Sequence, residues 1–280
     1  MRKRMVATIL AGVVILNTGC GNTTDNDTTT TKNSTTTEKI TTTEEITTTE
    51  EITTNNIEDT TTTEIDYSKV VDNFKDFDIN ASRINVPEDK IIEGYDFSED
   101  VFIGDSRTEG LTAYAVLTTS TVLATRGLMA SSALTNKFID VGNNEKSTII
   151  DYLKEHKFRK AYIMLGLNEL GCVIDTYVSS YKTLIDEIRE VNPDIEIYIL
   201  PVIPMVEERT DEVYNNEIIA IFNEELKKIC AEKEVPFINV SAALINEEGT
   251  LPEELSRDGI HLNTKGLTRM VNYLILATQN

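Results

Sequence analysis

The sequence has few of the residues on which metal and redox centres depend. Among its 280 residues there are three cysteines, two histidines and no tryptophan. Zinc and iron–sulfur sites need clusters of Cys and His side chains. Such a centre is therefore nearly excluded, and we expect the protein to use no metal and no cofactor.

Positive charge is also scarce. Asp and Glu number 47 against 26 Lys and Arg, which gives a net charge of −21. Nucleic-acid binding normally needs a basic surface, and adsorption to anionic lipid by charge needs one as well. The composition therefore argues against both kinds of partner and leaves the oligomeric state open.

The amino terminus carries a short apolar run. Residues 5–16 follow the basic residues Arg2, Lys3 and Arg4, an arrangement typical of a secretory signal. Twelve residues are too few to span a bilayer comfortably. We therefore interpret this run as the apolar region of an export signal.

The end of this signal, Gly19 and Cys20, resembles the lipobox of bacterial lipoproteins, in which the cysteine is lipidated and becomes the new amino terminus. Asn17 departs from the pattern, which usually has an aliphatic residue three positions before the cysteine. An ordinary secretory signal with an incidental cysteine is the alternative. We expect residues 1–19 to be a signal peptide and Cys20 to hold the protein, as a lipoprotein, on the outer face of the bacterial cell membrane.

A threonine-rich stretch follows. Residues 21–64 lack proline and aromatic residues, and 21 of these 44 residues are Thr. Three near-perfect hexads over residues 35–52 could indicate a small solenoid, but their isolated isoleucines cannot offset the entropy of ordering. We favour a solvated tether over residues 20–66, extended by its glutamates, and one folded domain over residues 67–280.

The expected domain alternates short apolar runs with helical patterns. Apolar residues recur at spacings of three and four within residues 177–191 and at four from Ile218 to Leu226, and Thr264 is placed to cap a last helix. This alternation predicts an α/β fold, a three-layer α/β/α sandwich around a parallel sheet. The five expected strands are residues 101–105, 121–125, 161–165, 195–200 and 237–240.

Polar residues stand where these strands end. Ser106 follows the first strand in Gly-Asp-Ser, Gly127 follows the second, and Asn168 follows the third in Gly-Leu-Asn. Taken singly, Ser106 and Asn168 could be ordinary caps. Ligands of open parallel sheets bind at the carboxyl ends of the strands, so we expect these residues to meet there.

One histidine supports a chemical role for this group. His261 stands three residues after Asp258, a carboxylate able to orient its imidazole, whereas His156 lies in a charged run typical of a solvated surface. A nucleophile, an oriented base and oxyanion donors are the parts that acyl transfer needs.

Four sequence motifs thus follow one another: Gly-Asp-Ser, the glycine after the second strand, Gly-Leu-Asn, and Asp258 with His261. In this order they resemble the motifs of the SGNH hydrolases, also called GDSL-type esterases. The resemblance covers nearly the whole expected domain. It implies a flavodoxin-like fold with five parallel strands. It also implies that Ser106 is the nucleophile, His261 the general base and Asp258 its orienting partner. The oxyanion donors would be the backbone N–H groups of Ser106 and Gly127 and the side-chain amide of Asn168.

Two positions depart from the family pattern. Arg107 stands where the family has Leu, and Glu169 where it has Asp. Arg107 could contact an anionic substrate or pair with a nearby Asp or Glu, and we prefer the ion pair.

The resemblance and the expected location together predict hydrolysis of a short acyl ester, such as an O-acetyl group on a carbohydrate or cell-wall glycan. Acyl transfer to a sugar hydroxyl is an alternative within the same chemistry. A non-catalytic binding module on a tether is the alternative outside it, although the full set of catalytic residue types disfavours it.

Besides Cys20 the sequence has two cysteines, Cys172 and Cys230, and such a pair could form a disulfide in an oxidising compartment. We predict instead that both thiols are free. Cys172 follows the third strand at the carboxyl end of the sheet, whereas Cys230 lies near the end of the helix that returns the chain to the opposite edge. A strand separates these edges by roughly 15–20 Å, and a disulfide needs Cα atoms within about 7 Å.

Overall fold

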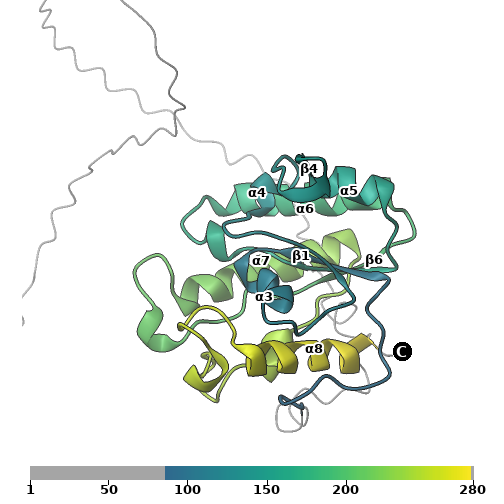
Figure 1. The fold of residues 1–280 in the computed structure, drawn as a ribbon. Helices are drawn as coiled ribbons and strands as arrows, with labels where there is room; N and C mark the ends of the chain where they lie inside the picture. Colours follow the sequence, from purple (N-terminus) through teal and green to yellow (C-terminus); the bar gives the residue numbers. More distant parts are fainter. Residues whose placement is uncertain (1–85, 279–280) are drawn as a thin grey trace, which may run out of the picture. The chain divides into compact units, whose positions relative to one another are not determined.

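The computed structural model describes residues 86–278 (Figure 1). The predicted signal peptide, Cys20, the tether over residues 20–66 and the first residues of the expected domain lie outside the described residues, so those predictions stay predictions.

The described chain forms an α/β fold around a parallel sheet with strand order β2–β1–β5–β6. Every residue of the two central strands is buried, as expected when helices cover both faces of a parallel sheet. In the register of the sheet, Gly104 lies opposite both Ala124 and Met164. The carboxyl ends of three strands are therefore level. The strands are β1 (Asp100–Gly104), β2 (Thr121–Ala124), β5 (Lys160–Met164) and β6 (Glu196–Ile199).

The expected fifth strand is wrong as a full strand, because residues 237–240 contribute one isolated bridge, between Ile199 and Phe237. Two hydrogen bonds form it: the Ile199 N–H donates to the Pro236 carbonyl, and the Ile238 N–H donates to the Ile199 carbonyl. The next donors of this parallel ladder would be the N–H groups of Pro201 and Pro236, and proline has none. The ladder therefore stops on both sides of the bridge.

The side chains of the central strands alternate between two apolar cores. Val101 and Ile103 face one core, and Phe102 faces the other. The first core is covered by α4 (Ala130–Ala133), α5 (Ile149–Glu155), α6 (Ile174–Val191) and α7 (Asn216–Lys233). The second is covered by α3 (Ser106–Ala113) and α8 (Thr264–Thr278), so the sheet lies between two helical layers (Figure 1).

The helices predicted over residues 177–191 and from Ile218 to Leu226 are confirmed, and both are longer than predicted. The last helix is confirmed too, but Thr264 is its first residue and does not cap it: Asn263 Oδ1 accepts the Gly266 N–H at 3.1 Å.

One hairpin was not predicted, because its strands show no apolar pattern in the sequence. Strands β3 (Ile139–Gly142) and β4 (Glu145–Ser147) pair antiparallel. Asn143 and Asn144 connect them with φ angles of 56° and 62°, which a two-residue hairpin turn requires and asparagine tolerates.

The prediction of free thiols is confirmed: Cys172 is exposed and Cys230 is buried, and neither forms a disulfide. Within residues 86–278, no helix is both long and apolar enough to cross a membrane.

Candidate active site

Ser106 occupies a tight turn between β1 and α3. Asp105, rather than Ser106, caps the helix: its Oδ1 accepts a hydrogen bond from the Arg107 N–H at 2.9 Å. The serine hydroxyl is thereby left for another partner. Gly104 makes the turn possible, because a Cβ there would lie 2.0 Å from Thr108 Oγ1 and 2.6 Å from the Met164 carbonyl oxygen.

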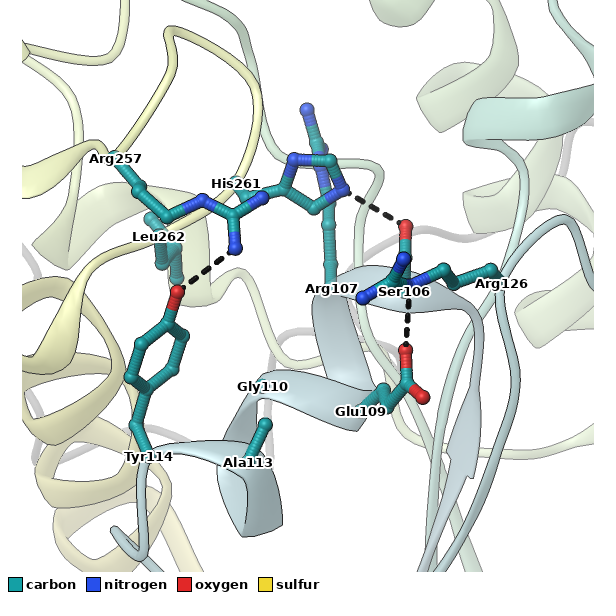
Figure 2. A pocket seen from close by; sticks show the side chains of 10 residues that line it. All are labelled: Ser106, Arg107, Glu109, Gly110, Ala113, Tyr114, Arg126, Arg257, His261 and Leu262. Carbon is teal, nitrogen blue, oxygen red and sulfur yellow. Dashed lines mark hydrogen bonds and ion pairs between the residues drawn. The ribbon is translucent and has the colours of Figure 1, made fainter.

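Three residues predicted from the sequence meet at this turn. Ser106 Oγ lies 2.9 Å from His261 Nε2 (Figure 2), and His261 Nδ1 lies 2.9 Å from Asp258 Oδ2. The serine begins α3, whereas the other two residues stand in the loop before α8, so the fold joins positions 155 residues apart. The hydrogen-bonded chain runs from hydroxyl through imidazole to carboxylate, the order that serine nucleophiles need.

Asp258 is held as a carboxylate by its neighbours. Burial acts to raise its pKa, but the backbone N–H of His261, the guanidinium of Arg257, the imidazole and the Ile260 N–H together hold the pKa well below the ordinary value. Arg257 donates to Asp258 Oδ2 at 2.8 Å and, through its other terminal nitrogen, to the Tyr114 hydroxyl, also at 2.8 Å. A stably ionised Asp258 can stabilise a protonated His261.

Sequence reasoning missed Arg257 and Tyr114. The adjacency of Arg257 to Asp258 in the chain was the one available signal, and no local pattern linked Tyr114 to either residue.

The three predicted oxyanion donors lie at the ends of β1, β2 and β5. Ser106 is the first residue of α3, so its N–H has no acceptor within the helix. Gly127 has a φ of 72°, a conformation that glycine adopts without strain. Asn168, in the 3₁₀ turn Leu167–Glu169, donates through Nδ2 to Asp105 Oδ2 at 3.2 Å and to the Leu128 carbonyl at 3.1 Å. Its amide therefore ties the ends of the three strands together.

Glu169 also contacts the segment that follows Gly127. Its Oε1 accepts a hydrogen bond from the Ala130 N–H, and its side chain is 2% exposed. Burial raises the pKa of this carboxyl to about 7; the Ala130 N–H opposes the shift and the Asp105 carboxylate adds to it. Asn168 and Glu169 thus hold, side by side, the segment that follows Gly127.

The prediction that Arg107 forms an ion pair is wrong, because no carboxylate among residues 86–278 lies within 4.0 Å of its guanidinium. The first turn of α3 directs the side chain behind the His261 ring (Figure 2) into the interior, where it donates to the Ile203 carbonyl. Burial lowers its pKa to about 10, against the opposing carboxylates of Asp105 and Asp258. Arg107 therefore remains a cation at neutral pH.

A cavity of about 290 Å³ opens over Ser106 and His261. Most of the residues that line it have polar or charged side chains, and Gly110, Ala113 and Leu262 are the exceptions. Within the described part of the chain, no group of Asp, Glu, Cys and His side chains has the arrangement of a metal site. The lining residues are Ser106, Arg107, Glu109, Gly110, Ala113, Tyr114, Arg126, Arg257, His261 and Leu262 (Figure 2).

Residues 102–269 match the model of the GDSL-like lipase/acylhydrolase family. The chain belongs to this family. The matched region begins in β1 and ends in α8, so it contains every residue of the site described above. A member of this family with this site is a serine ester hydrolase. No curated protein matches the sequence.

Solved structures agree with this assignment at the level of the fold. A protein from Streptococcus pneumonia, described as a platelet activating factor, is 20% identical with a TM-score of 0.50; the match covers 70% of this chain and 89% of that one. A GDSL-like lipase from Bacteroides thetaiotaomicron is 14% identical with a TM-score of 0.50, covering 68% of this chain and 92% of its own.

Proposed function

We propose that this ester hydrolase cleaves short acyl esters through Ser106, His261 and Asp258. The observation that carries the proposal is the continuous set of contacts, 2.9 Å from Ser106 Oγ to His261 Nε2 and 2.9 Å from His261 Nδ1 to Asp258 Oδ2. A serine hydroxyl is a weak nucleophile until an adjacent base removes its proton.

In the first half of the reaction, Ser106 Oγ forms a bond to the ester carbonyl carbon and its proton moves to His261 Nε2. Asp258 stabilises the resulting imidazolium through Nδ1. The tetrahedral intermediate then loses its alkoxy group, which takes the proton from His261 and leaves as the alcohol. In the second half, water attacks the acyl–serine ester, His261 accepts and returns a proton, and the carboxylic acid is released.

The negative oxygen of the intermediate would be stabilised by the N–H groups of Ser106 and Gly127 and by the amide of Asn168. Because the Asn168 amide already contacts Asp105 and Leu128, one of these contacts has to exchange for the oxyanion. Asn168→Ala should lower kcat on the order of 10²–10³-fold, the usual effect of removing one such donor.

The size and polarity of the cavity favour a short acyl group on a polar alcohol. At about 290 Å³ it is small, near the lower limit of pockets that enclose drug-sized ligands. Ala113 and Leu262 are its apolar contacts, too few to cover a long hydrocarbon chain. An O-acetyl group on a carbohydrate, including a cell-wall glycan, meets both conditions.

A fluorophosphonate probe, which reacts with activated serines, tests the assignment. We expect wild-type protein and the surface variant Ser98→Ala to be labelled, and Ser106→Ala and His261→Ala to remain unlabelled with unchanged circular dichroism. Wild type should release acetate from acetylated sugars and hydrolyse nitrophenyl acetate faster than nitrophenyl decanoate. Equal labelling of wild type and Ser106→Ala would overturn the proposal.

A further inference from the structure

Arginine is concentrated at the active-site cavity. Residues 67–280 carry a net charge of −15, yet three of the seven arginines between residues 86 and 278 line this one cavity, together with a single carboxylate, Glu109. The other two differ from Arg126: Arg107 is buried and donates one hydrogen bond, to the Ile203 carbonyl, and Arg257 donates to Asp258 and Tyr114. Arg126 has no comparable structural role.

The guanidinium of Arg126 forms few hydrogen bonds with the protein. The Arg126 side chain is 83% exposed, and its Nε donates one long hydrogen bond, to Glu109 Oε2 at 3.4 Å. That contact leaves both terminal nitrogens of the guanidinium for a ligand. These nitrogens belong to the planar donor fork that binds carboxylates through two parallel hydrogen bonds.

Arg126 is also well placed to contact a substrate. It directly precedes Gly127 in the chain, it lines the same cavity as Ser106, and its side chain meets Glu109 (Figure 2). Tyr114 and Arg257 form the other side of the cavity, with His261 between the two sides (Figure 2). An ester bound at Ser106 therefore shares this cavity with Arg126. If the acyl group is short, a charged group that reaches Arg126 has to belong to the alcohol.

We propose that the natural substrate is an acyl ester of a sugar that bears a carboxylate, and that this carboxylate binds Arg126 in place of Glu109. The inference rests on the proposed ester hydrolysis and specifies its substrate class. The negative charge of the rest of the protein does not oppose such binding strongly, because at physiological ionic strength charges separated by more than about 8 Å are largely screened.

The test compares two substrates that differ only in charge: a methyl hexoside and the corresponding methyl hexuronoside, each acetylated at the same hydroxyl. The ratio of their kcat/KM values is measured for wild type, Arg126→Gln, Glu109→Gln and the remote surface control Lys154→Gln. Wild type should prefer the uronoside by about twofold to fivefold, the effect expected of an ion pair with an exposed side chain.

Arg126→Gln should bring that ratio to about one, mainly through KM, because the contact binds substrate and transition state alike. Glu109→Gln should raise the ratio, since it removes the competing carboxylate, and Lys154→Gln should leave it unchanged. Raising the salt concentration should shrink the preference of wild type.

A wrong substrate class and a wrong proposed function would give different results. Equal kcat/KM values for the two esters in wild type, or an unchanged ratio in Arg126→Gln, would overturn the substrate class and leave ester hydrolysis standing. Absence of hydrolysis of either ester, together with absence of Ser106 labelling, would overturn the proposed function and the inference with it.

Discussion

The carboxylate of Asp258 contacts His261 at two points: Oδ2 lies 2.9 Å from the ring Nδ1, and Oδ1 accepts the backbone N–H at 2.8 Å. Both contacts fit within one short turn at Gly259, where φ is 88° and a Cβ would lie 2.0 Å from Arg209 Cγ. The three-residue spacing therefore lets one side chain both close the turn and set the orientation of the imidazole.

The Asp258→Asn variant should keep the turn but lose most of its activity. The amide oxygen can still accept the backbone N–H, but the side chain no longer stabilises an imidazolium, so we expect kcat to fall on the order of 10³–10⁴-fold. Steady-state kinetics with nitrophenyl acetate measures this, and circular dichroism checks the fold. A variant that keeps a tenth or more of the wild-type kcat would show that Asp258 is not the orienting carboxylate.

Glu169 should make stability depend on pH. Its folded-state pKa of about 7 exceeds the ordinary 4.5, so between these values the folded protein holds a proton that the unfolded chain has released. The free energy of unfolding therefore falls as pH rises through this window. Glu169→Gln does not titrate there, and its stability relative to wild type should rise by on the order of 2 kcal/mol from pH 4.5 to 7.

Urea unfolding at several pH values measures this difference, with Glu155→Gln as the exposed control. A pH profile of Glu169→Gln that parallels that of wild type would mean that the buried carboxyl ionises in the folded state as it does in the unfolded chain.

Gly104→Ala should destabilise the turn that presents the nucleophile. The added methyl group would overlap Thr108 Oγ1 and the backbone of Met164, and such overpacking costs about 1–3 kcal/mol. Gly171→Ala is the matched control, since its Cβ would meet the exposed side chain of Val213 at 3.1 Å, a contact that a shift of a few tenths of an ångström relieves. Thermal unfolding compares the two; similar midpoints would show that the turn can relax around a Cβ.

The cysteines should differ in reactivity. Cys172 is exposed and Cys230 is buried on α7, and burial also raises the pKa of the Cys230 thiol, which disfavours the reactive thiolate. Iodoacetamide should alkylate Cys172 in the native protein and both residues after denaturation without reductant, as mapped by peptide mass spectrometry. Failure to alkylate either residue after denaturation would indicate a disulfide.

We propose that the mature protein begins at Cys20 and is anchored through lipid attached there. Wild type should then partition with bacterial membranes, and Cys20→Ala should be released or remain unprocessed. Recovery of the wild-type protein from the medium, cleaved at another position, would show that Asn17 prevents recognition of the lipobox.

Much of the site could be predicted because its signals are local. Ser106, Gly127 and Asn168 each stand within three residues of the end of an expected strand, and parallel strands bring their carboxyl ends together by topology alone. The Asp258–His261 pair lies within one turn of chain. The environments of Glu169 and Arg107 could not be predicted in this way, because their burial depends on Ala130 and Ile203, which stand far from them in the sequence.

The amino-acid sequence by itself indicated the four sheet strands, the helices α6, α7 and α8 and the candidate residues of the site, because apolar periodicity and glycine turns act over a few residues. The tertiary structure decided which neighbours meet. Pro201 and Pro236 can be read from the sequence. Only the pairing of Ile199 with Phe237 shows that both prolines lie on one ladder of hydrogen bonds and end it there. The presence of Arg126 in the same cavity as Ser106 is likewise a property of the fold, since it depends on how the ends of β1 and β2 lie together.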